Sequence, residues 1–167
     1  RAWRWVAASF WRYFRDREPT LRRALVPFLL LSVLLYIRHP ATNYIFDEQE
    51  ALLANPYVNA SDGLTFGDAI HRDFWGLPPN ASIGSYRPIP NFIWRTTWYV
   101  TEHPFFHHLY NLIFHGLNGA LMASFAYALT GRRDVGWLAG GIFVGAAVIT
   151  EAVSGLVGIA DVLGGLG

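Results

Sequence analysis

Three long apolar blocks constrain the fold of this chain more than any other feature. Residues 25–37, 105–130 and 135–150 are almost wholly apolar, and they approach or exceed the roughly 20 residues that a helix needs to cross a bilayer. Apolar residues gathered into such blocks disfavour a soluble globule. We therefore expect an all-α polytopic membrane protein with three to four transmembrane helices.

The blocks divide the chain into five segments. Residues 1–20 are predicted to form a cytoplasmic interfacial amphipathic helix, and residues 21–37 the first transmembrane helix. Residues 38–103 are predicted to be a long external loop with surface helices, and residues 104–130 the second transmembrane helix. Residues 135–167 are expected to hold the third transmembrane helix, rich in glycine for close helix contact, and the start of a fourth element.

Arginine placement predicts the orientation. All 13 basic residues are arginine, and the seven before Ala24 face only Asp16 and Glu18, which gives that segment a charge of +5. Basic residues accumulate on the cytoplasmic side of membrane proteins. The N-terminus and the turn at Arg132 and Arg133 are therefore expected in the cytoplasm, and the loop 38–103 on the periplasmic or lumenal side.

The first segment has two faces when it is drawn as a helix. The apolar face carries Trp3, Val6, Ala7, Phe10 and Phe14, and the basic face carries Arg1, Arg4, Arg12 and Arg15. Large aromatics between arginines favour a membrane surface over a nucleic-acid arm, so the expected partner is the lipid bilayer and not nucleic acid. With no cysteine in the chain, a disulfide framework and a thiolate metal site are excluded, and no metal site is predicted.

Asp47 follows the first apolar block inside an acidic cluster, just outside the predicted membrane. By the predicted topology, Glu151 emerges on the same external side. Two such carboxylates suit a general base and a group that orients a ligand or binds a metal ion. They equally suit the solvated ends of two helices, and both interpretations stay open.

Four polar residues share one face of the second predicted transmembrane helix. His108, Asn111, His115 and Asn118 are spaced by three, four and three residues. Polar groups within a membrane are costly unless they are paired, so this face indicates either a structural hydrogen-bond ladder between helices or a functional cavity. A third interpretation is that His107, His108 or His115 ligates the metal of a tetrapyrrole.

Seven short motifs occur in a fixed order along the chain. They are Tyr44-Ile45-Phe46-Asp47, Asn55-Pro56, Phe74-Trp75-Gly76, Tyr86-Arg87-Pro88, His108-x-x-Asn111-x-x-x-His115-x-x-Asn118, Thr150-Glu151-Ala152-Val153 and Gly158-x-Ala160-Asp161. In order and spacing, they resemble the membrane O-mannosyltransferases that carry tetratricopeptide repeats. The resemblance covers residues 44–163.

The resemblance implies a GT-C fold, in which a multi-spanning helical protein holds its catalytic acid in the first external loop. It implies transfer of a sugar, typically mannose, from a polyprenyl-phosphate donor to a serine or threonine hydroxyl. On this basis Asp47 would be the base that deprotonates the acceptor, and Arg87 would contact the lipid phosphate. His108 and Glu151 would line the same external cavity, and the need for a divalent metal stays open.

The chain departs from that family at two motifs. Residues 146–151 read Ala-Ala-Val-Ile-Thr-Glu where the family typically has His-Pro-x-His-Thr-Glu, and Ile159 replaces an arginine. Isoleucine cannot supply charge near a phosphate. No tetratricopeptide pattern of ~34 residues is present. The start at Arg1 and the end at Gly167 within an apolar run suggest a fragment.

These observations lead to three functional hypotheses. The first is a truncated and catalytically impaired relative that serves as an accessory or structural subunit beside other membrane proteins. The second is the N-terminal catalytic segment of an active GT-C glycosyltransferase that transfers mannose to serine or threonine. The third is a pigment- or haem-binding membrane subunit.

Overall fold

A computed structural model describes residues 2–37, 43–44, 46–61 and 63–166. The described residues are helical, with turns and loops but no strand, in agreement with the all-α prediction. The chain forms two compact units. The first comprises Arg1–Ile37, Leu112–Thr150 and Gly165–Gly167, and the second comprises Arg38–Asn111 and Glu151–Gly164.

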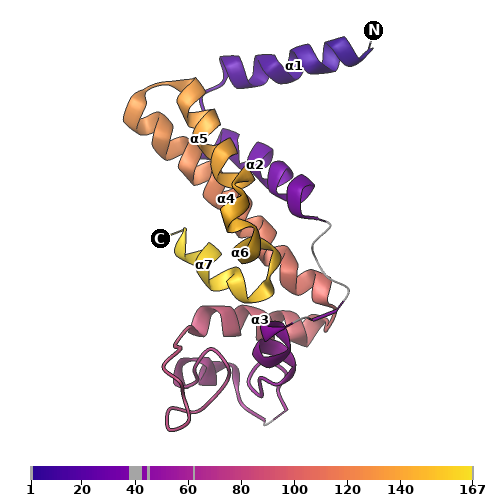
Figure 1. Cartoon of the computed structure of the whole chain (residues 1–167), viewed down its shortest axis with the longest axis vertical. Coiled ribbons are helices and arrows are strands. Elements are labelled where there is room, and N and C mark those ends of the chain that lie inside the picture. Colours follow the sequence, from indigo (N-terminus) through magenta and orange to yellow (C-terminus); the bar gives the residue numbers. More distant parts are fainter. Residues whose placement is uncertain (1, 38–42, 45, 62, 167) are drawn as a thin grey trace. The chain divides into compact units, whose positions relative to one another are not determined.

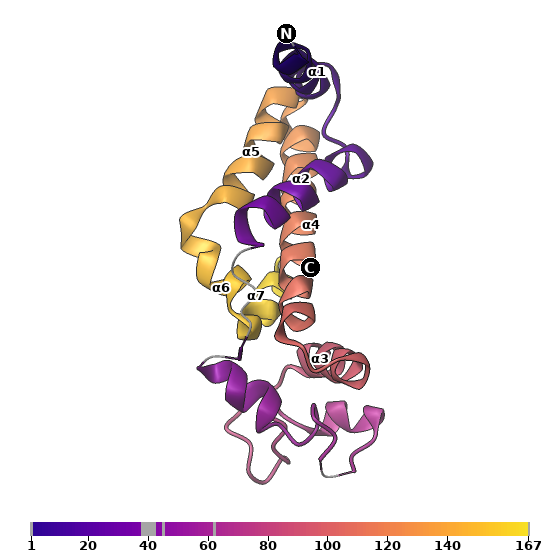
Figure 2. The same cartoon turned by 90° about the vertical axis from the view of Figure 1, so that its right-hand side faces the viewer.

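The first unit is built from long helices (Figures 1 and 2). They are α1 (Ala2–Asp16), α2 (Leu21–Tyr36), α4 (Pro104–Thr130) from Leu112 onward, and α5 (Arg133–Gly145), followed by the short turn η3 (Ala147–Ile149). Their shared core contains Ala24, Phe28, Ala120, Ala123, Trp137 and Val144. The side chains of Trp3, Val6, Ala7 and Phe10, on which the predicted apolar face of the first segment partly rests, lie outside the described residues.

Glycines allow the helices of the first unit to pack closely. A Cβ atom added at Gly140 would lie 2.5 Å from Cζ of Phe28 and 2.7 Å from the carbonyl oxygen of Gly119. One added at Gly119 would lie 2.3 Å from a methyl carbon of Val144, whereas one at Gly141 would meet no atom within 4 Å. Small residues at such contacts bring helix backbones together, as they do between membrane helices.

The second unit consists of short elements and one longer helix, α3 (Pro88–Val100). Pro88 and Pro90 lie in the first turn of α3, where a missing N–H removes no intrahelical bond. The N-terminal end of α4 up to Asn111 also belongs here. The short elements are η1 (Gln49–Leu53), η2 (Phe66–His71), α6 (Thr150–Ser154) from Glu151 onward, η4 (Leu156–Gly158) and α7 (Ile159–Gly164).

An aromatic cluster and a buried arginine hold the loop of the second unit together. The rings of Phe74 and Trp94 are buried with their centroids 5.1 Å apart. The guanidinium of Arg95 donates to the carbonyl oxygens of Tyr57 and Leu64, and it lies 4.7 Å from the centroid of the Tyr57 ring. A buried cation with hydrogen-bonded donors and a stacked aromatic face is a stabilising arrangement.

Two of the ordered motifs meet in this loop. Asn55 donates from Nδ2 to the carbonyl oxygen of Phe74 at 3.2 Å, and its Oδ1 accepts the N–H groups of Tyr57 and Val58. Gly76 has a left-handed backbone with φ of 79°, and a Cβ atom there would lie 2.1 Å from Oδ1 of Asn55. The Asn55-Pro56 and Phe74-Trp75-Gly76 motifs therefore form one contact that admits only glycine at position 76.

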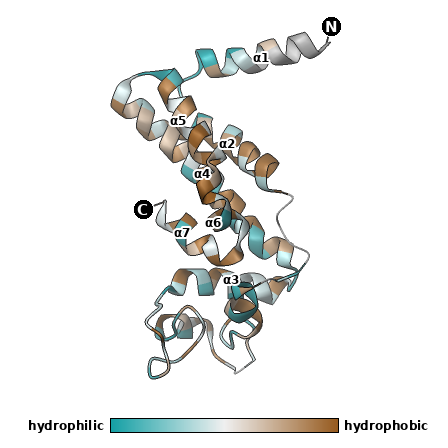
Figure 3. Ribbon diagram, in the orientation of Figure 1, coloured by the Kyte–Doolittle hydropathy of each residue, from teal (hydrophilic) through white to brown (hydrophobic). Residues whose placement is uncertain are grey.

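Among the described residues, one helix is long and apolar enough to cross a membrane, namely α4 with 27 residues. A second span results only if the bent segments Arg133–Gly145 and Ala147–Ser154 count as one. Residues 21–37, predicted as the first transmembrane helix, form the apolar helix α2, whose 16 residues are too few for it to count among these candidate spans (Figure 3). The predicted third helix ends at Gly145, because the backbone of Ala146 is extended.

Candidate functional site

The acidic cluster divides into an exposed and a buried carboxylate. Asp47 is exposed, whereas Glu48 is 4% exposed and faces the interior of the second unit. Both residues immediately precede η1, and the N–H of Gln49 donates to the carbonyl oxygen of Phe46 at 3.0 Å. A buried carboxylate is costly unless polar groups surround it, so the contacts of Glu48 are the starting point for the site.

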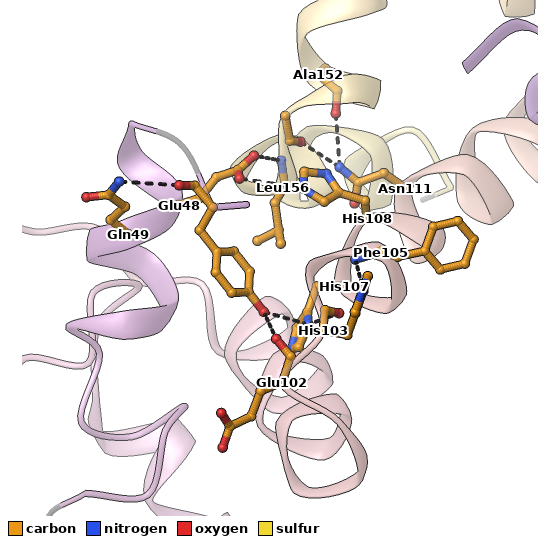
Figure 4. Close-up of polar contacts among 12 residues, drawn as sticks. Glu48, Gln49, Glu102, His103, Phe105, His107, His108, Asn111, Ala152 and Leu156 are labelled. Atoms are coloured by element: carbon orange, nitrogen blue, oxygen red, sulfur yellow. Dashed lines mark hydrogen bonds and ion pairs between the residues drawn. The ribbon is translucent and has the colours of Figure 1, made fainter. Parts of the chain in front are cut away.

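Glu48 connects three parts of the second unit (Figure 4). Its Oε1 accepts the backbone N–H of Leu156 at 2.9 Å, and its Oε2 lies 3.5 Å from Nε2 of His108. The side chains of Glu48 and His108 are both almost fully buried. Glu48 therefore anchors the start of η1 to the start of η4 and to the N-terminal end of α4.

Tyr44 anchors the same loop on the other side of Asp47. Its hydroxyl donates to the carbonyl oxygen of Glu102 at 2.8 Å and lies 3.1 Å from Nδ1 of His107. Burial raises the pKa of the Tyr44 hydroxyl, and the carboxylates of Glu102 and Glu48 raise it further. The phenol therefore stays protonated at neutral pH and keeps its role as a hydrogen-bond donor.

Asn111 continues the polar cluster toward the chain that follows α5. Its Nδ2 donates to the carbonyl oxygen of Gly155 at 2.7 Å and to that of Ala152 at 3.3 Å. Oδ1 of Asn111, Nδ1 of His108 and Oγ of Ser154 are buried without a hydrogen-bond partner among the described residues. The cluster thus holds the backbone at Ala152 and Gly155 in place, and three of its buried polar atoms could still form further hydrogen bonds.

Arg87 lies in a different part of the second unit. It is exposed, and its guanidinium carbon is 5.4 Å from the centroid of the Phe74 ring. It borders a groove of about 380 Å³. The lining residues are Arg87, Pro88, Ile89, Pro90, Ala160, Asp161, Leu163 and Gly164. The groove has largely apolar walls with one cation and one carboxylate at its edge, and Arg87 is the only predicted site residue that lines it among the described residues.

The remaining predicted residues are not among those that line this groove. Glu151 is exposed in α6. In the first unit, His115 is buried with Nε2 3.1 Å from the carbonyl oxygen of Val144. Asn118 is also buried, and a Cβ atom at Gly165 would lie 2.7 Å from its Nδ2. The His115 side chain thus contacts neighbouring backbone.

Sequence reasoning missed Glu48 and Tyr44. Adjacent carboxylates look alike in a sequence, and only the contact with Leu156, which lies 108 positions later, distinguishes Glu48 from Asp47. Tyr44 was noted only as part of a motif. Their positions in the sequence could have indicated both residues. Tyr44 and Glu48 lie within three residues of Asp47, where side chains can hold a functional carboxylate in position.

Histidine and acidic side chains are the possible metal ligands of this chain. No group of three or more histidine and acidic side chains gathers among the described residues in an arrangement that could hold an ion. Of the histidines proposed as tetrapyrrole ligands, His108 contacts Glu48 and His115 contacts the carbonyl oxygen of Val144. The haem hypothesis remains a prediction.

Comparison with known proteins gives a consistent set of relatives. The human protein O-mannosyl-transferase TMTC4 is 32% identical over 150 residues, which are 80% of this chain and 20% of that protein. Drosophila melanogaster protein O-mannosyl-transferase Tmtc2 is 31% identical over 135 residues, with 78% and 14% covered. Human protein O-mannosyl-transferase TMTC1 is 33% identical over 160 residues, with 89% and 18% covered.

The chain spans about a fifth or less of the length of these relatives. No family profile matches it. No solved structure matches it either.

Proposed function

We propose, from the premise that this chain is related to the protein O-mannosyl-transferases over about four fifths of its length, that it provides the acceptor-activating loop of a membrane sugar transferase. In the proposed reaction, Asp47 takes the proton of a serine or threonine hydroxyl. The freed oxygen attacks the anomeric carbon of the sugar, and the bond from that carbon to the phosphate of a polyprenyl-phosphate donor breaks. Mannose is the proposed sugar, as the names of the relatives suggest.

The observation that carries this proposal is an exposed carboxylate between two fixed neighbours. Asp47 is open to solvent, whereas Tyr44 and Glu48 are tied to other parts of the second unit. Phe46, directly before Asp47, has a left-handed backbone with φ of 47°, which is uncommon for a bulky residue. Such strain concentrates at functional sites and persists where the surroundings enforce it. A general base needs this combination of access and fixed position.

The groove beside Arg87 supports a place for the donor. A guanidinium suits a phosphate because it offers several donors in one plane, and the apolar walls suit a prenyl chain. Ile89, Pro90 and Leu163 supply apolar surface in that groove. We assign the phosphate to Arg87 and the first isoprene units to these walls.

The proposal includes a membrane setting. The apolar helix α4 supports a location in the bilayer, and the arginine bias supports a cytoplasmic N-terminus with the loop 38–103 on the external side. The GT-C fold and three to four transmembrane helices are part of the proposal.

The experiment is a transfer assay with membranes that contain the protein carrying this chain. Radiolabelled polyprenyl-phosphate mannose and a peptide rich in serine and threonine are supplied, and labelled peptide is counted. We expect Asp47→Asn to lower the rate by at least about 100-fold, the lower range of general-base catalysis. Glu50→Gln removes an exposed carboxylate three residues away and should leave the rate unchanged. Equal rates for the two variants would refute the assignment of Asp47.

A second candidate function is the impaired accessory subunit within a larger membrane assembly. One observation favours it. Ile159 stands where the family typically has an arginine, and its side chain is fully buried. This position therefore supplies no cation, and the buried isoleucine occupies the place of one. This candidate predicts no transfer that depends on Asp47, together with co-purification of other membrane subunits.

A further inference from the structure

The first unit has a basic groove that is lined by α1, the connection to α2, Arg23 of α2 and Arg133 of α5. Its volume is about 650 Å³. The charged residues that line it are Arg12, Arg17, Arg23, Arg133, Asp16 and Glu18. Four guanidinium groups and two carboxylates leave a net charge of +2 in one concave surface.

The two carboxylates are already engaged by some of these arginines. Glu18 lies 3.5 Å from the Arg23 guanidinium and 3.6 Å from that of Arg133. Asp16 pairs with Arg15 at 2.9 Å, and this hydrogen bond holds the pKa of Asp16 below its ordinary value. In the part of the chain that the structure describes, Arg12 and Arg17 are both exposed, and neither forms an ion pair within 4 Å. Two cations of the groove therefore form no salt bridge among the described residues, although Arg12 is near enough to Asp16 to lower the pKa of that carboxyl.

An apolar groove of about 830 Å³ lies on the other side of Arg12. Its apolar lining includes Trp11, Phe14, Trp137 and Leu138. Trp11 and Leu138 are more than half exposed, so this apolar surface is incompletely covered by the protein. Arg12 lines both grooves and places a cation at the boundary between a charged and an apolar surface.

We propose that this corner of α1 and α5 binds one anionic phospholipid. Its phosphate would lie between Arg12 and Arg17, and its acyl chains would lie along Trp11, Trp137 and Leu138. The charge matches the phosphate, and a guanidinium can bind two phosphate oxygens at once. The adjacent apolar groove distinguishes a lipid from a free phosphate, which needs no apolar surface.

The test measures lipid binding to the full chain in detergent by native mass spectrometry. Dipalmitoyl phosphatidylglycerol, dipalmitoyl phosphatidylcholine and inorganic phosphate are titrated separately. We expect phosphatidylglycerol to bind more tightly than phosphatidylcholine. Each unpaired arginine is expected to contribute about fivefold in affinity, as basic residues do near anionic lipid, so Arg17→Gln should weaken phosphatidylglycerol binding about fivefold.

Arg22→Gln is the matched control, because Arg22 is exposed in the same unit and does not line the groove. It should bind phosphatidylglycerol like the wild type. Arg17→Gln leaves the backbone carbonyl of Arg17 in place to accept the Trp137 indole N–H at 2.9 Å, so the fold should be retained. Equal binding of the two lipids, equal loss in the two variants, or phosphate binding as tight as that of the lipid would each overturn the proposal.

Discussion

The buried carboxylate of Glu48 allows a quantitative prediction, because its contacts with Leu156 and His108 are defined. Glu48→Gln keeps an acceptor for the N–H of Leu156 but removes the charge that faces His108. Hydrogen bonds to charged groups contribute about 1.5–3 kcal/mol and neutral ones about 0.5–1.5 kcal/mol. Since Gln keeps the acceptor for the Leu156 N–H and loses the charge beside His108, we expect the free energy of unfolding to fall by about 2 kcal/mol.

The assay is thermal unfolding of the full chain in detergent, followed by tryptophan fluorescence. For a chain of this size, the expected loss lowers the Tm by about 4–8 °C. Glu50→Gln is the control, since Glu50 is exposed in the same short helix. Amide hydrogen exchange at Leu156 gives a local readout, and it should accelerate more in Glu48→Ala than in Glu48→Gln because the N–H loses its acceptor. Identical Tm values for Glu48→Gln and Glu50→Gln would show that the buried contacts of Glu48 do not stabilise the fold.

Two further predictions concern packing and pH. Gly140→Ala should destabilise the chain by about 1–3 kcal/mol, as overpacking does, because the new methyl group meets backbone and ring atoms at 2.8 Å or less. Gly141→Ala places its methyl group in open space and should raise the free energy of unfolding by up to about 1 kcal/mol through helix propensity. The same thermal unfolding assay compares the two variants. Equal Tm values would contradict the close contact at Gly140. In η2, hydrogen bonds from the hydroxyl and the N–H of Thr65 lower the pKa of Asp68. The stabilisation of η2 by this cap is therefore fully present at a pH above the ordinary pKa of a carboxyl group. It is lost as the pH falls through the lowered pKa of Asp68. Thr65→Val should raise the pKa of Asp68 in an NMR titration, and an unchanged pKa would refute the role of the hydroxyl.

The helices were predicted from the sequence more closely than the site. Helices were predicted within residues 38–103, and α3 is one of them, with Pro88 fixing its start. The block 105–130 appears within α4, because a long apolar run leaves little choice of structure. The break after Gly145 escaped prediction, since a glycine-rich apolar run is compatible with both a continuous and an interrupted helix. The burial of Glu48 escaped it as well, because burial depends on residues more than 100 positions away.

The contact between Asn55 and Gly76 has a consequence for how this loop can evolve. Any side chain at position 76 would collide with the amide group that closes the turn after Asn55. The two positions are therefore constrained together, because Gly76 cannot be replaced while Asn55 closes this turn. In an alignment of related chains, joint retention of Asn55 and Gly76 would mark those that keep this loop, even where the acidic residues near Asp47 have diverged.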